Sequence, residues 1–391
     1  MPFKKSILHL IALQQKALQQ NALKTTLCAF MMLPCIGYAA SDKDTGKGLH
    51  FYHQDWEVAC DNTRTCRAAG YQSDEGNSDS FPISVLFTRK AGIGQLVSGE
   101  VKLGTTDYVD DQPMPQSVQL SINNTAYGKV TLDSGLSGTL SASQIQALIA
   151  ALAGHTVIEF QSGQDTWNLS GQGAAAVLLK MDDVQGRVGT TGALLRKGKK
   201  NEGSVLPAVA KPVVRWVKPD SKAQAKPALQ QAIKAVDLQQ LQQQLVKQQQ
   251  ALQQRLQASK ESYSADECPV LTENDDYAKF ELTIEPLNSH QLLASGLCWR
   301  GAYNEGYGYW VINAHKPYQP KLVTASASDY ADGVITSDQK GRGLGDCWSH
   351  EAWTWNGQQF IHTHESTTGM CRLIELGGAW ELPTRVATVK K

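Results

Sequence analysis

The residues that could carry out acid–base or metal chemistry gather near the C-terminus, around Asn356-Gly357. Asn-Gly between two runs of alternating apolar and polar residues predicts a β-hairpin with a two-residue type I′ turn. Counting outward from that turn places Glu351 opposite His362, and side-chain alternation places His364 on the same strand face. Imidazole and carboxylate groups on one face could hold a metal ion or transfer protons. The same pattern is also typical of a solvated outer strand.

Two further groups in this region could contact a ligand. A Gly-rich run at 340–346 contains Arg342 and Asp346, but it lacks the GxxxxGK[ST] spacing of a phosphate loop. We expect its glycines to allow a tight backbone path and Arg342 to pair with Asp346, with a ligand-binding loop as the alternative. Trp353 and Trp355 could stack on sugar rings if they are exposed, or they could fill the protein core.

The cysteines and the N-terminal segment both indicate export. Residues 1–40 contain lysines but no acid, then a short apolar run over 27–38, and end in small residues, as a cleaved signal peptide does. Six cysteines follow, and an even number in an exported chain favours disulfides over reduced thiols. None shows the paired CxxC spacing of zinc sites. Of the 15 pairings that six cysteines allow, their clustering along the chain favours Cys60–Cys66, Cys268–Cys298 and Cys347–Cys371.

Charge and composition divide the chain into regions. Residues 41–195 and 261–391 each carry 10 basic and 17 acidic side chains, whereas 196–260 carry 13 basic and 3 acidic side chains. The prolines and lysines of 196–227 predict an extended linker. Residues 228–260 are rich in Leu and Gln and lack Gly and Pro, which predicts an amphipathic helix. That helix could pack on its own domains or self-associate as a short coiled coil.

The two acidic regions carry the signals of β-structure. Short β-branched and aromatic runs, separated by Gly, Asn and Asp, predict strands. In the first region these runs cover 51–59, 65–71, 83–89, 96–101, 118–122, 157–160 and 166–169. Ser141 and Gln144 predict a capping box for a helix that ends at Gly154, and a second helix is predicted over 174–181. We expect a β-dominated α+β fold, with two β-rich domains joined by the basic linker and the Gln-rich amphipathic helix.

Three blocks of sequence resemble one known family. They are Asp55-Trp56-Glu57-Val58-Ala59-Cys60 with Cys66-Arg67-Ala68-Ala69-Gly70-Tyr71; Leu169-Ser170-Gly171 through Asp182, Gln185-Gly186-Arg187 and Ala193-Leu194; and 340–347 with Trp353, Trp355, Cys371 and Trp380. Together they are similar to the domain of unknown function 1176 family. The first block also resembles, more weakly, invasion-associated locus B proteins. The resemblance implies an exported bacterial protein and brings no activity with it. Trp348 and 362–364 depart from the family pattern.

The sequence favours binding over catalysis. It lacks a GxSxG nucleophile elbow, and every cysteine after the leader has an expected partner, so no thiol nucleophile or cofactor is predicted. We predict a non-catalytic periplasmic binding or envelope-assembly protein whose partner is an envelope protein or a glycan. Nucleic acid is excluded by export, and no transmembrane segment is expected in the mature chain. The alternative is a periplasmic glycan-processing enzyme or metal-binding protein that uses Glu351, His362 and His364.

Overall fold

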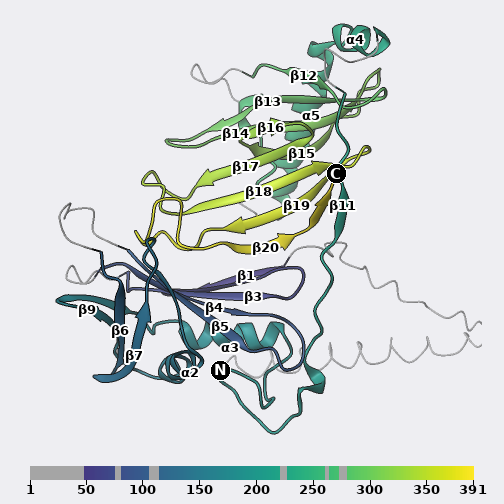
Figure 1. Cartoon of the computed structure of the whole chain (residues 1–391). Coiled ribbons are helices and arrows are strands. Elements are labelled where there is room, and N and C mark those ends of the chain that lie inside the picture. The colour runs from purple at the N-terminus through teal and green to yellow at the C-terminus, as the bar shows by residue number, and fades with distance from the viewer. Residues whose placement is uncertain (1–47, 75–80, 105–113, 221–226, 260–263, 273–279) are drawn as a thin grey trace, which may run out of the picture. The chain divides into compact units, whose positions relative to one another are not determined.

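The computed structural model describes residues 48–74, 81–104, 114–220, 227–259, 264–272 and 280–391 (Figure 1). The expected signal peptide at 1–40 lies outside these residues. Residues 46–391 form one compact unit. Within the described part of the chain, no helix is both long and apolar enough to cross a lipid bilayer. Strands dominate and helices are few, so the predicted β-dominated α+β class is confirmed.

The described residues of the N-terminal half form two antiparallel sheets and the α-helices α2 and α3 (Figure 1). The first sheet has the strand order β1 (Leu49–His53), β2 (Trp56–Cys60), β3 (Cys66–Tyr71), β4 (Ile83–Arg89), β5 (Val97–Leu103) and β8 (Ser137–Thr139). The second has the order β10 (Asp165–Leu169), β9 (Ile158–Ser162), β6 (Ser117–Ile122) and β7 (Thr125–Thr131). Helices α2 (Ala142–Ala151) and α3 (Ala174–Val184) contribute to the core that these sheets share.

Local sequence signals explain most of these elements. The predicted capping box forms, because the Ser141 hydroxyl accepts the Gln144 N–H at 3.3 Å and the Gln144 side chain accepts the Ser141 N–H at 2.9 Å. The strand predicted over 51–59 is instead two strands, since the chain turns at Gln54, where φ is 52°. Every residue of β2 is buried, so both faces of this strand are covered.

The C-terminal half contains two more antiparallel sheets that pack face to face around one core. One has the order β12 (Thr283–Pro286), β13 (Gln291–Arg300), β14 (Glu305–Asn313) and β15 (Lys321–Ala327). The other has the order β16 (Asp329–Ala331), β17 (Val334–Lys340), β18 (Trp348–Trp355), β19 (Phe360–Thr367) and β20 (Leu382–Val386). Leu293 and Val311 from the first sheet meet Ile335 and Trp355 from the second.

The hairpin at Asn356 forms with a register that differs from the predicted one. Trp355 pairs with Phe360, so the loop has four residues rather than two. A type I′ turn needs positive φ at both central residues, but only Gly357 has it, with φ of 94°, and Asn356 does not. The Asn356 side chain instead accepts the N–H groups of Gln358 and Gln359, each at 2.9 Å. These side-chain hydrogen bonds stabilise the four-residue loop in place of the two-residue type I′ turn.

The Gln-rich segment forms two helices rather than one, α4 (Pro227–Lys234) and α5 (Leu238–Ser259). Asp237 separates them, because its carboxylate accepts the Gln240 N–H at 2.9 Å and so caps the start of α5. Leu241 and Leu245 pack into the core of the C-terminal half. The apolar stripe that predicted a helix is therefore used within the chain, and self-association stays a prediction.

The basic segment between the halves is hydrogen-bonded to both of them. Leu206 accepts the Gly92 N–H at 3.0 Å in the N-terminal half. Further along, β11 (Val213–Arg215) pairs in parallel with β21 (Thr388–Lys390), and the Val217 N–H donates to the Trp355 carbonyl at 3.0 Å. Residues 206–217 are thus hydrogen-bonded to both halves, and the division of the chain into two independent domains stays a prediction.

Candidate functional site

The three predicted disulfides are confirmed. The sulfur atoms lie 2.00 Å apart in Cys60–Cys66, 2.02 Å apart in Cys268–Cys298 and 1.90 Å apart in Cys347–Cys371. The first joins the ends of β2 and β3, where the two cysteines are directly opposite each other. Each bond therefore stays within its own half of the chain, as the spacing predicted.

The Gly-rich run lies against the Cys347–Cys371 bond. A Cβ on Gly341 would lie 2.6 Å from the Cys347 sulfur, so only glycine fits there. Arg342 and Asp346 bind each other through two contacts, at 2.7 and 2.5 Å. Burial opposes the charge on Asp346, but Arg342 and the Leu373 N–H outweigh it and hold the pKa of this carboxyl below its usual value. The two side chains predicted as ligand contacts are thus occupied with each other.

A buried ion pair joins the N-terminal signature to the loop that follows Cys371. Arg372 donates to Asp55 at 3.0 Å, and both side chains are more than nine-tenths buried. The other guanidinium nitrogen lies 2.7 Å from the carboxylate of Asp74. Asp55 also accepts the Ser170 hydroxyl at 2.6 Å. Residues from both halves therefore share this carboxylate.

A second buried carboxylate, Glu57, makes the neighbouring contacts. It accepts the Tyr71 hydroxyl at 2.7 Å and the Met370 N–H at 2.8 Å, and its other oxygen lies 2.7 Å from His50 Nε2. Burial, together with the charge of Glu57, raises the pKa of Tyr71 well above its ordinary value. The Tyr71 hydroxyl therefore stays protonated and keeps donating to Glu57.

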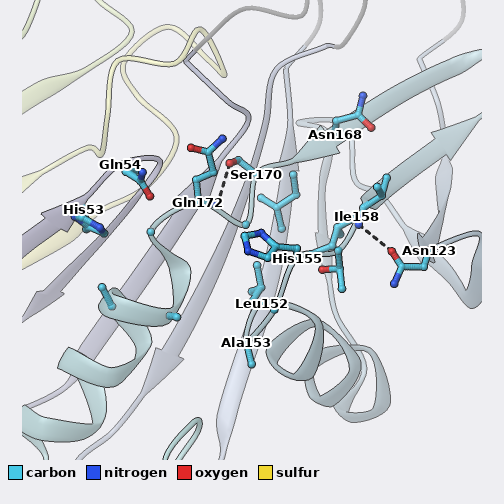
Figure 2. A pocket seen from close by; sticks show the side chains of 18 of the residues that line it. His53, Gln54, Asn123, Leu152, Ala153, His155, Ile158, Asn168, Ser170 and Gln172 are labelled. Carbon is cyan, nitrogen blue, oxygen red and sulfur yellow. Dashed lines mark hydrogen bonds between the residues drawn. The ribbon is translucent and has the colours of Figure 1, made fainter.

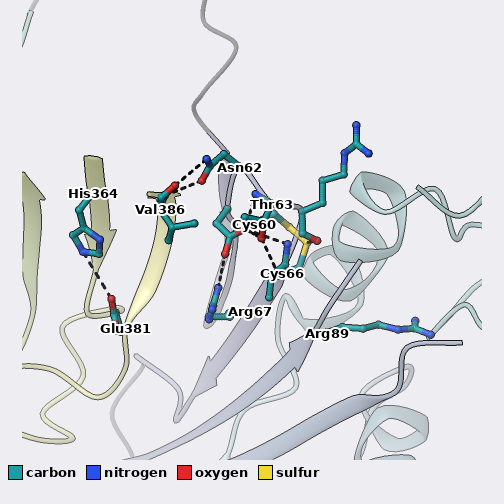
Figure 3. Close-up of polar contacts among 12 residues, drawn as sticks. Cys60, Asn62, Thr63, Cys66, Arg67, Arg89, His364, Glu381 and Val386 are labelled. Carbon is teal, nitrogen blue, oxygen red and sulfur yellow. Dashed lines mark hydrogen bonds and ion pairs between the residues drawn. A yellow bond between two sulfur atoms is a disulfide. The ribbon is translucent and has the colours of Figure 1, made fainter. Parts of the chain in front are cut away.

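The edge strand β20 completes this junction, which we define as the contacts of Asp55, Glu57, Asn62 and Tyr71 with 370–386. Asn62 accepts the Val386 N–H at 2.7 Å and donates to the Val386 carbonyl at 3.0 Å, beside the Cys60–Cys66 bond (Figure 3). An amide side chain thus satisfies both backbone groups of Val386 at the edge of β20. At the junction the first sequence block meets the residues on either side of Cys371, and these contacts hold the two halves together.

The middle sequence block has a comparable role inside the N-terminal half. Asp182 is fully buried and accepts the Leu194 N–H at 2.6 Å, with Arg89 at 3.5 Å. Arg187, also fully buried, donates to the Gly92 carbonyl at 2.6 Å. Burial lowers the pKa of Arg187 and raises that of Asp182. These buried charges bind backbone groups of neighbouring loops and leave no open site between them.

The structure brings Glu351 and His362 together, although the predicted register was wrong. His362 lies opposite Trp353 rather than opposite Glu351, and the two rings stack with centroids 4.7 Å apart. From there His362 Nε2 reaches a Glu351 oxygen at 3.0 Å. Glu365 lies directly opposite Glu351. Ligand atoms of Glu351, His362 and Glu365 all lie within 4.8 Å of one another.

His364 lies on the other face of the sheet. A β-bulge between the Ala352 and Trp353 pairs adds one residue to β19, and this reverses the alternation on which the prediction depended. His364 instead contacts Ser366 at 2.9 Å and Glu381 at 3.8 Å (Figure 3). Burial lowers the pKa of His364. The expected triplet of Glu351, His362 and His364 is therefore corrected, since Glu365 takes the third place.

Trp353 and Trp355 are core residues. Trp355 is fully buried and Trp353 is 8% exposed, and both pack between the two sheets of the C-terminal half. Neither ring has a free face for a sugar, so the interpretation of these tryptophans as stacking contacts is corrected. The alternative prediction, that these tryptophans fill the protein core, describes their environment. Trp355 lies opposite Phe360 in the sheet.

The sequence analysis did not identify a large cleft in the N-terminal half. It has a volume of about 1160 Å³. The polar residues labelled in Figure 2 are His53, Gln54, Asn123, His155, Asn168, Ser170 and Gln172, and Thr156 and Glu159 also line the cleft. The labelled polar side chains come from the β1–β2 turn, the β6–β7 turn, the loop after α2 and the end of β10. Ser170 and Gln172 fall in the middle sequence block, but none of these segments carries a ligand-binding motif, and only the fold places them around one cleft.

The cleft combines polar groups, among them one carboxylate from Glu159, with an apolar floor. Leu152, Ile158 and Leu169 are buried beneath it. The Asn123 side chain accepts the Val157 N–H at 3.0 Å, and the Ser170 hydroxyl accepts the Gln172 N–H at 3.1 Å, so parts of the rim are held in place (Figure 2). Amide groups both donate and accept hydrogen bonds, which suits a ligand that does the same.

The fold and its buried junction define a disulfide-bonded, β-dominated α+β protein whose three sequence blocks hold its architecture together. The chain belongs to the family described as "Protein of unknown function (DUF1176)", whose model matches residues 50–387. It is similar to "Uncharacterized protein YpfG" of Escherichia coli strain K12, with 23% identity over 331 residues, which span 78% of this chain and 84% of the relative.

A weak structural likeness accompanies this assignment. The crystal structure of invasion associated protein b from Bartonella henselae is 13% identical, and the match covers 35% of this chain and 98% of that one. The TM-score is 0.23, which is too low to carry an argument about fold or function.

Proposed function

We propose that this chain is an exported envelope protein that binds a glycan in the cleft of its N-terminal half and does not catalyse a reaction on it. Export to the periplasm is supported by the signal-peptide pattern of 1–40 and by the three disulfides, which persist in oxidising compartments. The cleft is the observation that carries the binding function.

A glycan matches the chemistry of the cleft better than a charged or purely apolar ligand does. Sugar rings present many hydroxyls, which donate and accept, and apolar C–H faces. The cleft offers Gln172 and His155 for the hydroxyls and the exposed side chain of Val157 for the faces. Ligand sites commonly combine an apolar surface with a few convergent polar groups in this way.

The lining of the cleft favours binding without hydrolysis. Most glycoside hydrolases place two carboxylates on either side of the scissile bond. Among the described residues that line the cleft, Glu159 is the single carboxylate. A glycan bound there would meet hydrogen-bonding groups but no acid–base pair of the usual kind.

Calorimetric titration of the untagged chain with soluble peptidoglycan glycan strands tests the binding function. The variants His155→Ala and Gln172→Ala remove exposed side chains from the cleft, and Gln243→Ala on α5 is the matched control. We expect the two cleft variants, combined, to weaken binding at least about tenfold, as expected for two lost hydrogen bonds, and the control to bind as wild type does. The absence of wild-type binding, or equal binding by all variants, would refute the proposal.

Export has its own test. The chain is expressed from its own start, the periplasm is released by osmotic shock, and the protein recovered there is sequenced from its N-terminus. We expect the first residue to be Ala40 or Ser41. Recovery of the unprocessed chain from the cytoplasm would contradict export and leave the cleft titration unaffected.

A further inference from the structure

Three side chains of the C-terminal half converge from β18 and β19 outside the junction and the cleft. Glu351 and Glu365 lie opposite each other on neighbouring strands, and His362 comes directly before the bulge that shifts the register. Their ligand atoms, one from each residue, all lie within 4.8 Å of one another. One imidazole and two carboxylates form a donor set of nitrogen and oxygen, and from this set we infer that the three residues bind one Zn²⁺ ion.

The position of the His362 nitrogen supports this inference. His362 Nε2 is buried and makes no hydrogen bond, although it lies 3.0 Å from a Glu351 oxygen. Buried polar atoms are rarely left without a partner. Two ligands of a tetrahedral zinc ion would lie about 3.4 Å apart, given metal–ligand distances near 2.1 Å. The two atoms are therefore close to the spacing that a shared ion requires.

The orientation of the imidazole is already set. The Trp353 ring stacks on His362 with an angle of 13° between the planes and 4.7 Å between centroids. Trp353 is held between two sheets and is 8% exposed, so it restrains the ring in one plane. A ligand that does not need to reorient binds a metal with a smaller loss of conformational entropy.

The donor set also selects the metal. Imidazole suits zinc and its neighbours in the periodic table, whereas magnesium and calcium prefer oxygen alone. Three protein ligands leave a fourth position of a tetrahedral ion for water or an outside ligand. The His362 and Glu351 side chains are 23% and 34% exposed, so the cluster lies at the margin of the core and not deep inside it.

The neighbouring His364 provides a matched control. It is two residues away on the same strand but faces Ser366 and Glu381 on the opposite side of the sheet. His362→Gln and His364→Gln therefore remove the same chemical group from the same strand. Only the first removes a donor from the proposed site.

The experiment is a calorimetric titration of the untagged, chelator-treated chain with Zn²⁺, in excess Mg²⁺. We expect one ion per chain, with at least a 100-fold weaker Kd for His362→Gln and for Glu351→Gln, and a Kd within threefold of wild type for His364→Gln. Circular dichroism of the metal-free variants confirms folding. No zinc binding by wild type, or equal losses in His362→Gln and His364→Gln, would overturn the site.

Trp353 supplies a second readout that locates the ion. Co²⁺ bound to His362 would quench the stacked indole, so we expect the fluorescence of wild type to fall on adding Co²⁺ with a one-to-one end point. Trp353→Phe should remove most of that quenching while calorimetry still detects Zn²⁺. Undiminished quenching in Trp353→Phe would place the ion elsewhere and overturn the assignment. Glycan binding in the N-terminal cleft is not needed for either result.

Discussion

Two clusters of charged side chains in this protein differ in how their polar atoms are hydrogen-bonded. At the junction, Asp55 and Glu57 are buried and receive donors from Arg372, Ser170, Tyr71 and the Met370 backbone. On the inner face of the C-terminal sheet, Glu351 and Glu365 meet His362, whose buried Nε2 makes no hydrogen bond.

The difference separates a cluster whose polar groups join the two halves from one that contains a buried imidazole nitrogen without a hydrogen bond. On the N-terminal side, Asp55, Glu57 and Tyr71 belong to the first sequence block, and their partners Met370 and Arg372 flank Cys371 of the third block. The polar groups of these residues join the two halves. The Glu351 cluster lies partly at 362–364, where the sequence departs from the family pattern. A resemblance to a family of unknown function therefore points mainly to architecture here, and the candidate metal site has to be found by geometry.

Removing the central cation of the junction should have the largest effect. Arg372→Ala leaves Asp55 buried without its cation, and such a loss costs about 3–5 kcal/mol of the free energy of unfolding. Urea denaturation measures it. Arg300→Ala is the control, because its pair with Glu305 is about half exposed and contributes at most about 1 kcal/mol. Equal losses in the two variants would show that the junction is not structural.

Removing the disulfide next to Arg372 should have the next largest effect. Cys347 and Cys371 are 24 residues apart, and replacing both by Ala should lower the free energy of unfolding by about 3 kcal/mol. The matched double variant at Cys60 and Cys66, 6 residues apart, should lose about 2 kcal/mol because its loop is shorter. Denaturant titrations under oxidising conditions compare the two, and a larger loss at Cys60–Cys66 would reverse the expected order.

A single hydroxyl at the junction tests the contribution of one hydrogen bond. Tyr71→Phe removes the donor to Glu57, which is a charged acceptor, and should cost about 2 kcal/mol. Tyr307→Phe removes a contact to the half-exposed Glu305 at 3.3 Å and should cost less than about 1 kcal/mol. The comparison uses the midpoints of urea unfolding. A Tyr71→Phe protein as stable as wild type would mean that the buried pair tolerates the loss.

A substitution in the Glu351 cluster should not lower the free energy of unfolding. In metal-free protein, His362→Phe keeps the ring stacked on Trp353 and removes a buried nitrogen that lacks a hydrogen bond. We expect the free energy of unfolding to be unchanged or raised by up to about 1 kcal/mol. Added Zn²⁺ should then stabilise wild type but not the variant. A marked loss of stability in metal-free His362→Phe would show that this cluster stabilises the fold, as the junction does.

The smallest expected effect is a pH dependence that arises from His364. Burial holds its pKa below the ordinary value of 6.5, while Glu381 and Asp338 favour its charge and His350 and His362 oppose it. Below about pH 6.5 the unfolded chain binds a proton at this histidine that the folded chain does not bind. The free energy of unfolding therefore decreases as the pH is lowered through that window. His364→Gln should remove this part of the slope. Coincident slopes for the two proteins between pH 7.5 and 5 would contradict it.

The predictable elements are those whose signals are local. The capping box at Ser141 and Gln144 acts over four residues, and strands such as Ile83–Arg89 were predicted at their observed bounds. The disulfides followed from clustering in the sequence because each bond closes a short loop. The prediction of a single helix over 228–260 was wrong, because the cap at Asp237 divides the segment into two helices.

A feature could not be predicted where two hydrogen-bonding arrangements compete or where segments distant in the sequence meet. The Asn356 turn depended on whether its side chain or its backbone would make the bonds, and the bulge near His362 depended on packing across three strands. A shift of one residue moves a side chain to the other face of a sheet, so His364 and Glu365 exchanged roles. The cleft could not be inferred at all, since its lining comes from turns far apart in the chain.

The amino-acid sequence by itself determined the β-dominated class, the disulfide pairs and the family, because these depend on composition, short-range periodicity and local motifs. The tertiary structure decided which charges became buried partners and which converged as candidate ligands. That division has a physical reason. Hydrogen-bond partners and metal donors must meet within a few ångströms, and for Asp55 with Arg372 or the lining of the cleft only the packing of sheets brings such residues together.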